Sequence, residues 1–244
     1  MICICFFGLT RSLQLTYPSI SKQIFSVFKE SNITWDTYVH TYNLRELTNR
    51  RSKEFQCALD PDEYTLLDPF REMVQNQDVF DKSITLETYK KHGDPWSDNY
   101  KSLRNLLRQL NSLQQVTNLW VSEGKQYDAV IYLRPDLYYV APFPIAQLKE
   151  CIEAKERQIY TPGWHKWKGL NDRLAMGKPE IMQIYGTRFS VAASYAAQKK
   201  LHAERFLAFV VSTNQIRDKP FRIYGNRVRA NGEILKDVKS SGKR

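Results

Sequence analysis

Segments typical of strands, which are either apolar runs or alternating sequences, are interspersed with helix-like segments along this chain. Residues 2–7 (ICICFF) and 35–41 are separated by a helical pattern, and 128–134 follows a long amphipathic one. A strand, a helix and a second strand form a βαβ unit, in which the strands pair in parallel through a right-handed crossover. The sequence therefore predicts an α/β fold: a mostly parallel central sheet flanked by helices, with these three runs as neighbouring core strands.

The spacing of apolar residues predicts where the helices lie. One helix is expected over residues 18–30, with Pro18 in its first turn, and another over 98–123, ending at Gly124. A third is expected over 145–155, and more helices within 179–210. No repeat or low-complexity segment interrupts the pattern. We expect one domain over residues 1–237 and a solvated tail over 238–244.

The amino-acid composition limits the classes of ligand that we expect the protein to bind. A net charge of +10 and a pI near 9.4 favour polyanionic ligands such as phosphate-bearing cofactors. The basic residues are scattered rather than interleaved with aromatic ones, which argues against nucleic acid. An aromatic content of 13% is typical of a protein that binds flat ligands such as sugars, or of a tyrosine-rich core.

The cysteine pattern and the length of the apolar runs indicate which cellular compartment to expect. The four cysteines form no CxxC pair and no Cys/His cluster with zinc spacing, so neither a zinc site nor a disulfide framework is implied. No stretch approaches about 18 consecutive apolar residues, and the short apolar run at residues 2–7 lacks the basic n-region and the cleavage site of a signal peptide. We expect a soluble protein of a reducing, cytoplasmic compartment, without a transmembrane segment.

Polar residues stand at the carboxyl ends of the predicted strands, where open α/β sheets bind ligands. The first strand ends in Gly8, Thr10 and Arg11, which suit a phosphate or form a plain strand-to-helix turn. The second ends in His40 and Tyr42. A single histidine at a strand end is either a ligand-binding residue or a structural residue whose hydrogen bonds stay within the protein. We take these five residues as candidates for binding a phosphate-bearing donor molecule.

The third strand ends in Arg134-Pro135-Asp136. Asp136 is a candidate ligand for a divalent cation that bridges phosphate oxygens, and Arg134 is a candidate donor to the same phosphates. This is the logic of the Asp-x-Asp motif of glycosyltransferases, with arginine in place of the first aspartate. The alternative is an internal ion pair between Arg134 and Asp136 that closes the strand.

An ordered set of segments resembles a known group of proteins. The set is ICICFFGLTRSL, WDTYVHTYNL, GDPWSDNYKSLRNLLRQLNSL, YDAVIYLRPDLYY, WHKWKGLNDRLAMG, HAERFL and RVRANG. Together they resemble glycosyltransferase domains of large DNA viruses of algae and amoebae, and of some algae, over nearly the whole chain. The resemblance implies a GT-A-like fold, transfer of a hexose or pentose from a nucleotide-sugar to a glycan or glycoprotein, and Mn²⁺ or Mg²⁺ as cofactor. It also implies a viral protein of glycan biosynthesis in the host cytoplasm.

The same resemblance gives roles to later residues. Asp172 is the candidate general base for the acceptor hydroxyl, with a helix N-cap as its alternative, and Glu204 is the reserve base. Arg229, with Arg227, is a candidate to close over the diphosphate, or else points outward from an edge strand. The candidates for the acceptor or sugar side are Trp164, His165, Trp167 and Asn171, whose alternative is aromatic packing under a loop.

A second function class stays open at this point. A non-catalytic carbohydrate- or nucleic-acid-binding module on the same fold would retain the aromatic residues and the positive charge. The single carboxylate at Asp136 is compatible with it.

Overall fold

The computed structural model of the chain describes residues 1–236 and is built around a seven-stranded sheet. Residue 237 and the tail predicted over 238–244 lie outside the described residues. The strand order is β10-β8-β9-β6-β1-β2-β5. The bounds, in that order, are Arg217–Phe221, Gln158–Pro162, Ala175–Gly177, Ala129–Leu133, Ile2–Phe7, Trp35–Tyr42 and Arg71–Gln75.

The three predicted core strands are neighbours, as expected. β1 pairs in parallel with β2 on one side and with β6 on the other, and β2 pairs in parallel with β5. β9 runs antiparallel to β6 and β8, and β10 is parallel to β8. The mostly parallel sheet confirms the predicted fold class. It also brings the carboxyl ends of β1, β2 and β6 to one edge.

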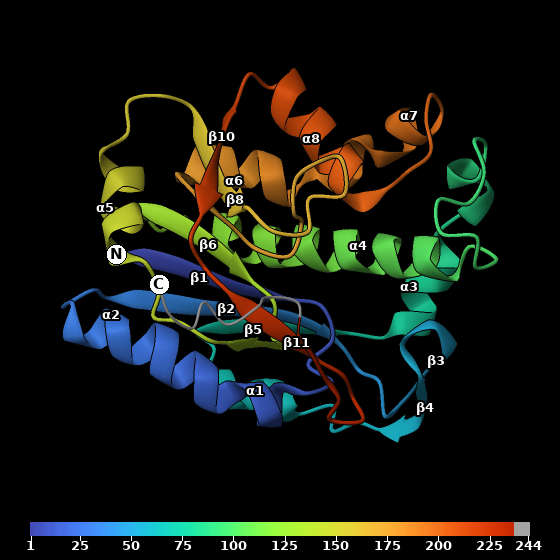
Figure 1. Cartoon of the computed structure of the whole chain (residues 1–244), viewed down its shortest axis with the longest axis horizontal. Coiled ribbons are helices and arrows are strands. Elements are labelled where there is room, and N and C mark those ends of the chain that lie inside the picture. Colours follow the sequence, from blue (N-terminus) through green and yellow to red (C-terminus); the bar gives the residue numbers. More distant parts are fainter. Residues whose placement is uncertain (237–244) are drawn as a thin grey trace.

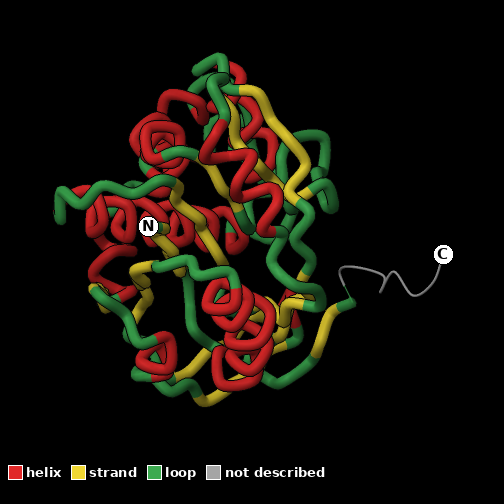
Figure 2. Tube along the Cα trace, turned by 90° about the vertical axis from the view of Figure 1, so that its left-hand side faces the viewer, coloured by secondary structure: helices red, strands yellow, loops and turns green. Residues whose placement is uncertain are grey.

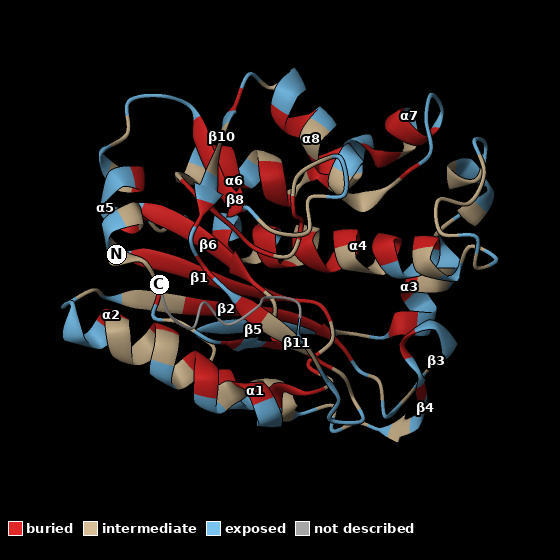
Figure 3. Cartoon of the chain, viewed as in Figure 1, coloured by how far each residue is buried: buried red, intermediate tan, exposed pale blue. Residues whose placement is uncertain are grey.

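Helices cover both faces of the sheet (Figures 1 and 2). On one face lie α1 (Leu13–Ile20), η1 (Ser21–Phe25), α2 (Ser26–Glu30) and α5 (Ile145–Glu153), packed on a core that includes Phe6. On the other lie α4 (Lys101–Ser122), α6 (Pro179–Gly186) and α8 (Ala203–Thr213), over a core that includes Phe7. Sandwiched in this way, β1 and β6 are buried along their whole length (Figure 3), which explains their continuous apolar sequences.

The first helical segment begins five residues earlier than predicted, and Pro18 lies inside α1 rather than in its first turn. The side chain of Ser12 does not cap this helix. Instead the carboxylate of Glu63 accepts hydrogen bonds from the backbone N–H groups of Leu13 and Gln14, at 3.1 and 2.9 Å. The start of the helix is thus set by a residue 50 positions away, which no local pattern reveals.

Smaller elements complete the edges of the fold. A three-stranded sheet, β12-β11-β7, and a two-stranded sheet, β3-β4, lie beside the central sheet. Their bounds are β3 Glu46–Asn49, β4 Glu54–Ala58, β7 Leu137–Tyr139, β11 Gly225–Val228 and β12 Ile234–Leu235. The remaining helical elements are η2 Arg50–Ser52, η3 Glu63–Leu67, α3 Gln77–Ser83, η4 Leu86–Tyr89, η5 Arg188–Val191 and α7 Ala192–Ala196. Within residues 1–236, every helix is too short or too polar to cross a lipid bilayer.

Candidate functional site

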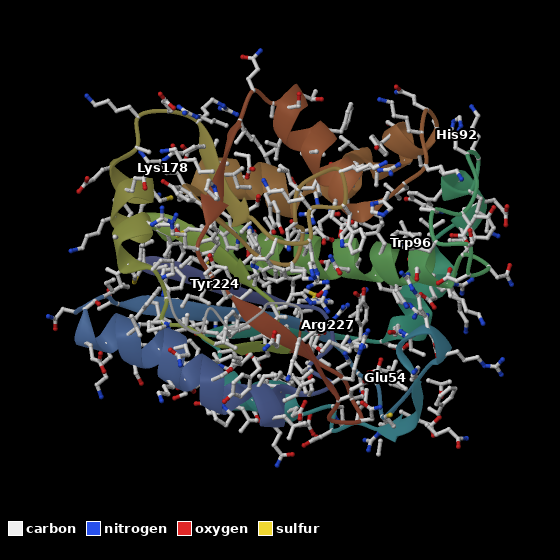
Figure 4. All side chains as sticks on the ribbon, in the orientation of Figure 1. Glu54, His92, Trp96, Lys178, Tyr224 and Arg227 are labelled. Atoms are coloured by element: carbon white, nitrogen blue, oxygen red, sulfur yellow. The ribbon has the colours of Figure 1, made fainter. Side chains whose placement is uncertain are left out.

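A cleft of about 550 Å³ opens at the carboxyl ends of the parallel strands. Gly8 follows β1, Tyr42 ends β2 and Arg134 follows β6, and all three line it. The amino-terminal half of α4, the loop before β9 and the start of α8 contribute the opposite side. Three residues around the cleft, Trp96, Glu54 and Arg227, come from distant parts of the chain and lie in the right-hand half of Figure 4. The position is the one expected for ligand binding in an open α/β sheet.

The lining of the cleft is strongly cationic. Seven arginines line it, namely Arg11, Arg51, Arg108, Arg134, Arg173, Arg227 and Arg229. The carboxylates that line it, among the described residues, are Asp172 and Glu204. Such a surface attracts anionic ligands, and guanidinium groups match the geometry of phosphate oxygens. Of the predicted donor-binding residues, Gly8, Arg11, Tyr42, Arg134 and Arg229 are brought together here.

An ionic cluster lies beneath this lining. Arg134 donates from Nε and Nη2 to the two carboxylate oxygens of Asp136, at 2.8 and 2.9 Å. Arg11 donates from Nη2 to Asp136, at 2.9 Å, and from Nη1 to Glu54, at 3.2 Å. Burial would raise the pKa of the Asp136 carboxyl, but the charges of Arg134 and Arg11 outweigh it and hold that pKa well below its usual range. Asp136 therefore stays ionised and fixes both guanidinium groups.

The predicted metal-binding role of Asp136 does not agree with this arrangement. Its side chain has no exposed surface, and both its oxygens already accept hydrogen bonds from arginine. Within residues 1–236, moreover, no group of three or more His, Cys, Asp or Glu side chains is placed to hold a metal ion. The residues present do not fit Mn²⁺ or Mg²⁺, whose sites need open carboxylate oxygens. Arg134 and Asp136 form the internal ion pair that was the alternative interpretation of the motif.

Asp172 lies in the loop between β8 and β9 and lines the cleft, although only 6% of it is exposed. It is not a helix N-cap, because α6 begins only at Pro179, after Lys178. Its Oδ2 accepts a hydrogen bond from Gln109 Nε2 at 2.7 Å, and Gln109 Oε1 accepts one from Arg134 Nη1, also at 2.7 Å. Gln109 thus connects a carboxylate to the cationic floor of the cleft.

Glu204 lines the cleft from the first turn of α8. Its Oε2 lies 3.1 Å from Nδ1 of His202, and the ring of His202 stacks on Trp96 with centroids 5.2 Å apart. The loop that carries Asp172 is held close to this turn, because Leu170 N donates to Glu204 O at 3.0 Å. A Cβ on Gly169 would overlap the Glu204 carbonyl, so only glycine permits this approach. Both candidate bases therefore face one cleft.

Of the four predicted sugar-side residues, Trp167 alone lines the cleft. It is 62% exposed, so its ring presents a flat apolar face. Trp164 instead packs against the core and donates from its indole N–H to Ile223 O, at 3.0 Å. Asn171 is buried and donates to Trp164 O, at 2.7 Å, while the ring of His165 contacts the rings of Trp164 and Trp167. For these three, aromatic packing under a loop describes the structure better than direct sugar contact.

Two predicted donor-binding residues also lie outside the cleft. His40 is fully buried under α4, and its Nδ1 is 2.8 Å from Ser112 Oγ, which also accepts a hydrogen bond from Gly8 N. Thr10 is buried in the turn, where its carbonyl accepts a hydrogen bond from Leu13 N. The side chain of His40 points to the face of the sheet that α4 covers rather than past the strand end, so its role is to support Gly8 through Ser112.

Three important residues were missed from the sequence: Glu54, Gln109 and Ser112. Glu54 is buried at the start of β4 and accepts hydrogen bonds from Arg11, from Ser52 Oγ and from Ala230 N. It stands in an irregular polar stretch without a motif. Gln109 and Ser112 lie on α4, where the amphipathic pattern identifies the apolar face but gives a polar residue no particular partner.

Comparisons with known proteins add the following. No protein-family model matches this sequence, and no curated protein matches it. Mouse xyloside xylosyltransferase 1, in its apo form, aligns over 91% of this chain and 85% of its own, at 12% identity and a TM-score of 0.44. The galactosyltransferase LgtC, in complex with donor and acceptor sugar analogues, aligns over 89% of this chain and 73% of its own, at 8% identity and a TM-score of 0.44. At this degree of similarity neither structure assigns an activity to the chain.

Proposed function

We propose that this chain is a GT-A-like glycosyltransferase, which moves a hexose or pentose from a nucleotide-sugar to a hydroxyl of a glycan or glycoprotein. One observation carries the proposal: a cationic floor and a carboxylate face the same cleft at the ends of the parallel strands. Arg134 and Asp172 are joined there through Gln109, by two hydrogen bonds of 2.7 Å. This pairing suits a reaction with an anionic leaving group and a hydroxyl nucleophile.

The chemistry follows from that pairing. The acceptor oxygen attacks the anomeric carbon, the bond from that carbon to the diphosphate oxygen breaks, and its electron pair stays on the diphosphate. Arg11 and Arg134 stabilise the negative charge that develops there. Asp172 takes the proton of the acceptor hydroxyl as general base, and Glu204 is the second carboxylate within the cleft.

Trp167 supplies the surface for a sugar ring. Its exposed indole lies at the cleft, on the same loop as Asp172. Sugar rings present apolar C–H faces that pack on such aromatic side chains, while their hydroxyls need the polar groups nearby. We assign Trp167 to the acceptor side, because its loop also carries the proposed base.

The proposal is tested with Asp172→Asn. Wild-type protein is screened against UDP-, GDP- and dTDP-sugars with glycan acceptors, and release of the nucleoside diphosphate is measured. With the donor and acceptor that the wild-type protein turns over, Asp172→Asn should lower turnover by roughly a hundredfold or more, because the general base is lost. Asparagine still offers Gln109 a carbonyl oxygen, so the melting temperature and the affinity for the donor should stay close to the wild-type values.

Glu204→Gln serves as the comparison variant, since Glu204 lines the same cleft. Wild-type turnover in Asp172→Asn with loss of turnover in Glu204→Gln would transfer the role of base to Glu204. If no nucleotide-sugar is turned over or bound, and only glycans or oligonucleotides stabilise the protein against heat, the chain is a binding module and the proposal is wrong.

A further inference from the structure

We propose that Arg11 and Arg134 bind the diphosphate of the donor directly, in the place where a metal ion would otherwise stand. The inference rests on the proposed function, since it names the groups that hold the proposed donor. It starts from the observation that Asp136 stands at the strand end, where a metal ligand is expected, but is enclosed by Arg11 and Arg134 and so is not open to a metal ion.

The two arginines are held in place from below. Their side chains are only 10% and 15% exposed, and the carboxylates that bind them, Asp136 and Glu54, have no exposed surface. A cation approaching Asp136 would have to break three charge-assisted hydrogen bonds, two from Arg134 and one from Arg11. The carboxylates therefore orient the guanidinium groups and are themselves withheld from the cleft.

Hydrogen-bond donors remain on both guanidinium groups. Each carries five N–H bonds, and the pair uses five of its ten: three of Arg134, to Asp136 and Gln109, and two of Arg11, to Asp136 and Glu54. Nε of Arg11 is buried and has no hydrogen-bond partner. The N–H bonds left on the Nη atoms of the two groups are the donors that phosphate oxygens entering the cleft would engage.

The strand-end glycine makes room beside Arg134. Gly8 has a φ of +98°, which L side chains rarely adopt, and a Cβ built there would lie 3.9 Å from Arg134 Nη2. Its backbone N–H is fixed by Ser112 Oγ at 2.7 Å. The main chain can thus pass close to a ligand seated on Arg134 without presenting a side chain to it.

The charges nearby also suit a diphosphate. Arg229 Nη1 lies 3.8 Å from Glu54 Oε2, and the charge of Arg227 helps to lower the pKa of Asp136. Four guanidinium groups therefore surround two carboxylates in this cluster. A diphosphate that links a nucleoside to a sugar carries about one negative charge per phosphate.

Calorimetric titration with inorganic pyrophosphate tests the inference. In EDTA, wild-type protein should bind pyrophosphate without any divalent cation. Mn²⁺ alone should give no binding heat. Pyrophosphate binding that appears only with Mn²⁺, or binding of Mn²⁺ alone at the strand-end site, would overturn the inference.

Arg11→Gln locates the binding, because it leaves Asp136 paired with Arg134 and so should fold. It should weaken pyrophosphate binding in EDTA by roughly tenfold or more, the usual cost of losing a charge-assisted hydrogen bond. The matched control is Arg217→Gln, an equal loss of charge on the 66%-exposed side chain of the edge strand β10, and it should bind like wild type. Equal weakening in both variants would indicate a general charge effect and reject the assignment.

The outcomes separate this inference from the proposed function. Metal-independent binding of pyrophosphate that depends on Arg11 supports the inference, even if no nucleotide-sugar is turned over. Turnover of a nucleotide-sugar that is abolished by EDTA and restored by Mn²⁺ supports the glycosyltransferase and rejects the metal-free diphosphate site.

Discussion

The imidazole of His40 has no exposed surface, and burial lowers its pKa from 6.5 to about 4. The unfolded chain therefore binds a proton at this residue below about pH 6.5, whereas the folded protein does so only below about pH 4. The free energy of unfolding should consequently fall as the pH falls through this window. One pKa unit corresponds to about 1.4 kcal/mol, so the loss attributable to His40 is on the order of 3 kcal/mol.

Denaturant unfolding between pH 7 and 4 measures this loss. His40→Gln should show a shallower decrease than wild type, because glutamine takes up no proton. His92→Gln is the control, since His92 is exposed and its Nε2 lies 3.0 Å from Ala197 O. Parallel pH profiles for wild type and His40→Gln would show that His40 is not buried as a neutral ring.

At the scale of elements, α4 and α6 pack through a contact that requires glycine. Thr117 of α4 and Tyr132 of β6 lie with their hydroxyl oxygens 2.6 Å apart, and Trp120 Nε1 donates to Tyr132 at 2.9 Å. A Cβ on Gly186, the last residue of α6, would overlap Thr117 Oγ1 and lie 2.6 Å from the Tyr132 hydroxyl. The helix end therefore rests directly on a buried polar network.

Gly186→Ala should destabilise the protein by about 1–3 kcal/mol, the usual cost of overpacking a core. For a chain of this length the melting temperature falls by about 2–4 °C per kcal/mol. Gly163→Ala provides the comparison, because among residues 1–236 its added methyl group would meet just Pro220 Cβ, at an ordinary contact distance of 3.9 Å. Thermal denaturation followed by circular dichroism should separate the two variants, and equal melting temperatures would contradict the close approach.

At the scale of the whole molecule, the cores on the two faces of the sheet share the same strands. Phe6 and Phe7 are consecutive in β1, both are fully buried, and their side chains enter cores on opposite faces. A change in either core therefore acts on one common sheet. This continuity is the reason to expect one cooperative unit across residues 1–236.

Phe6→Ala and Phe7→Ala test this cooperativity. Each should cost about 3–5 kcal/mol, as expected for a buried phenylalanine. Because both cores include β1, each variant should lower a single calorimetric transition as a whole. Two transitions, of which each variant shifts only one, would mean that the faces unfold independently and that the chain is not a single domain.

The sequence determined the strands and the edge at which the cleft lies. β1 and β6 lie under helices on both faces, which demands apolar runs that are visible locally, and the strand predicted over residues 35–41 corresponds to β2. Because parallel strands end at the same edge of a sheet, the sequence alone predicts that Arg11 and Arg134 lie at one cleft, and both line it.

Only the tertiary structure decided what those side chains do there. Asp136 follows a strand end just as a metal ligand would, yet Arg11, 125 positions away, and Arg134 enclose it. Glu54 reaches Arg11 across 43 positions, and Gln109 reaches Asp172 across 63. Local sequence patterns encode the hydrophobic periodicity of helices and strands and the places where they end. The partner of a buried charge is instead chosen by the folded chain, since a charge taken out of water must be paired by whichever group the fold brings to it.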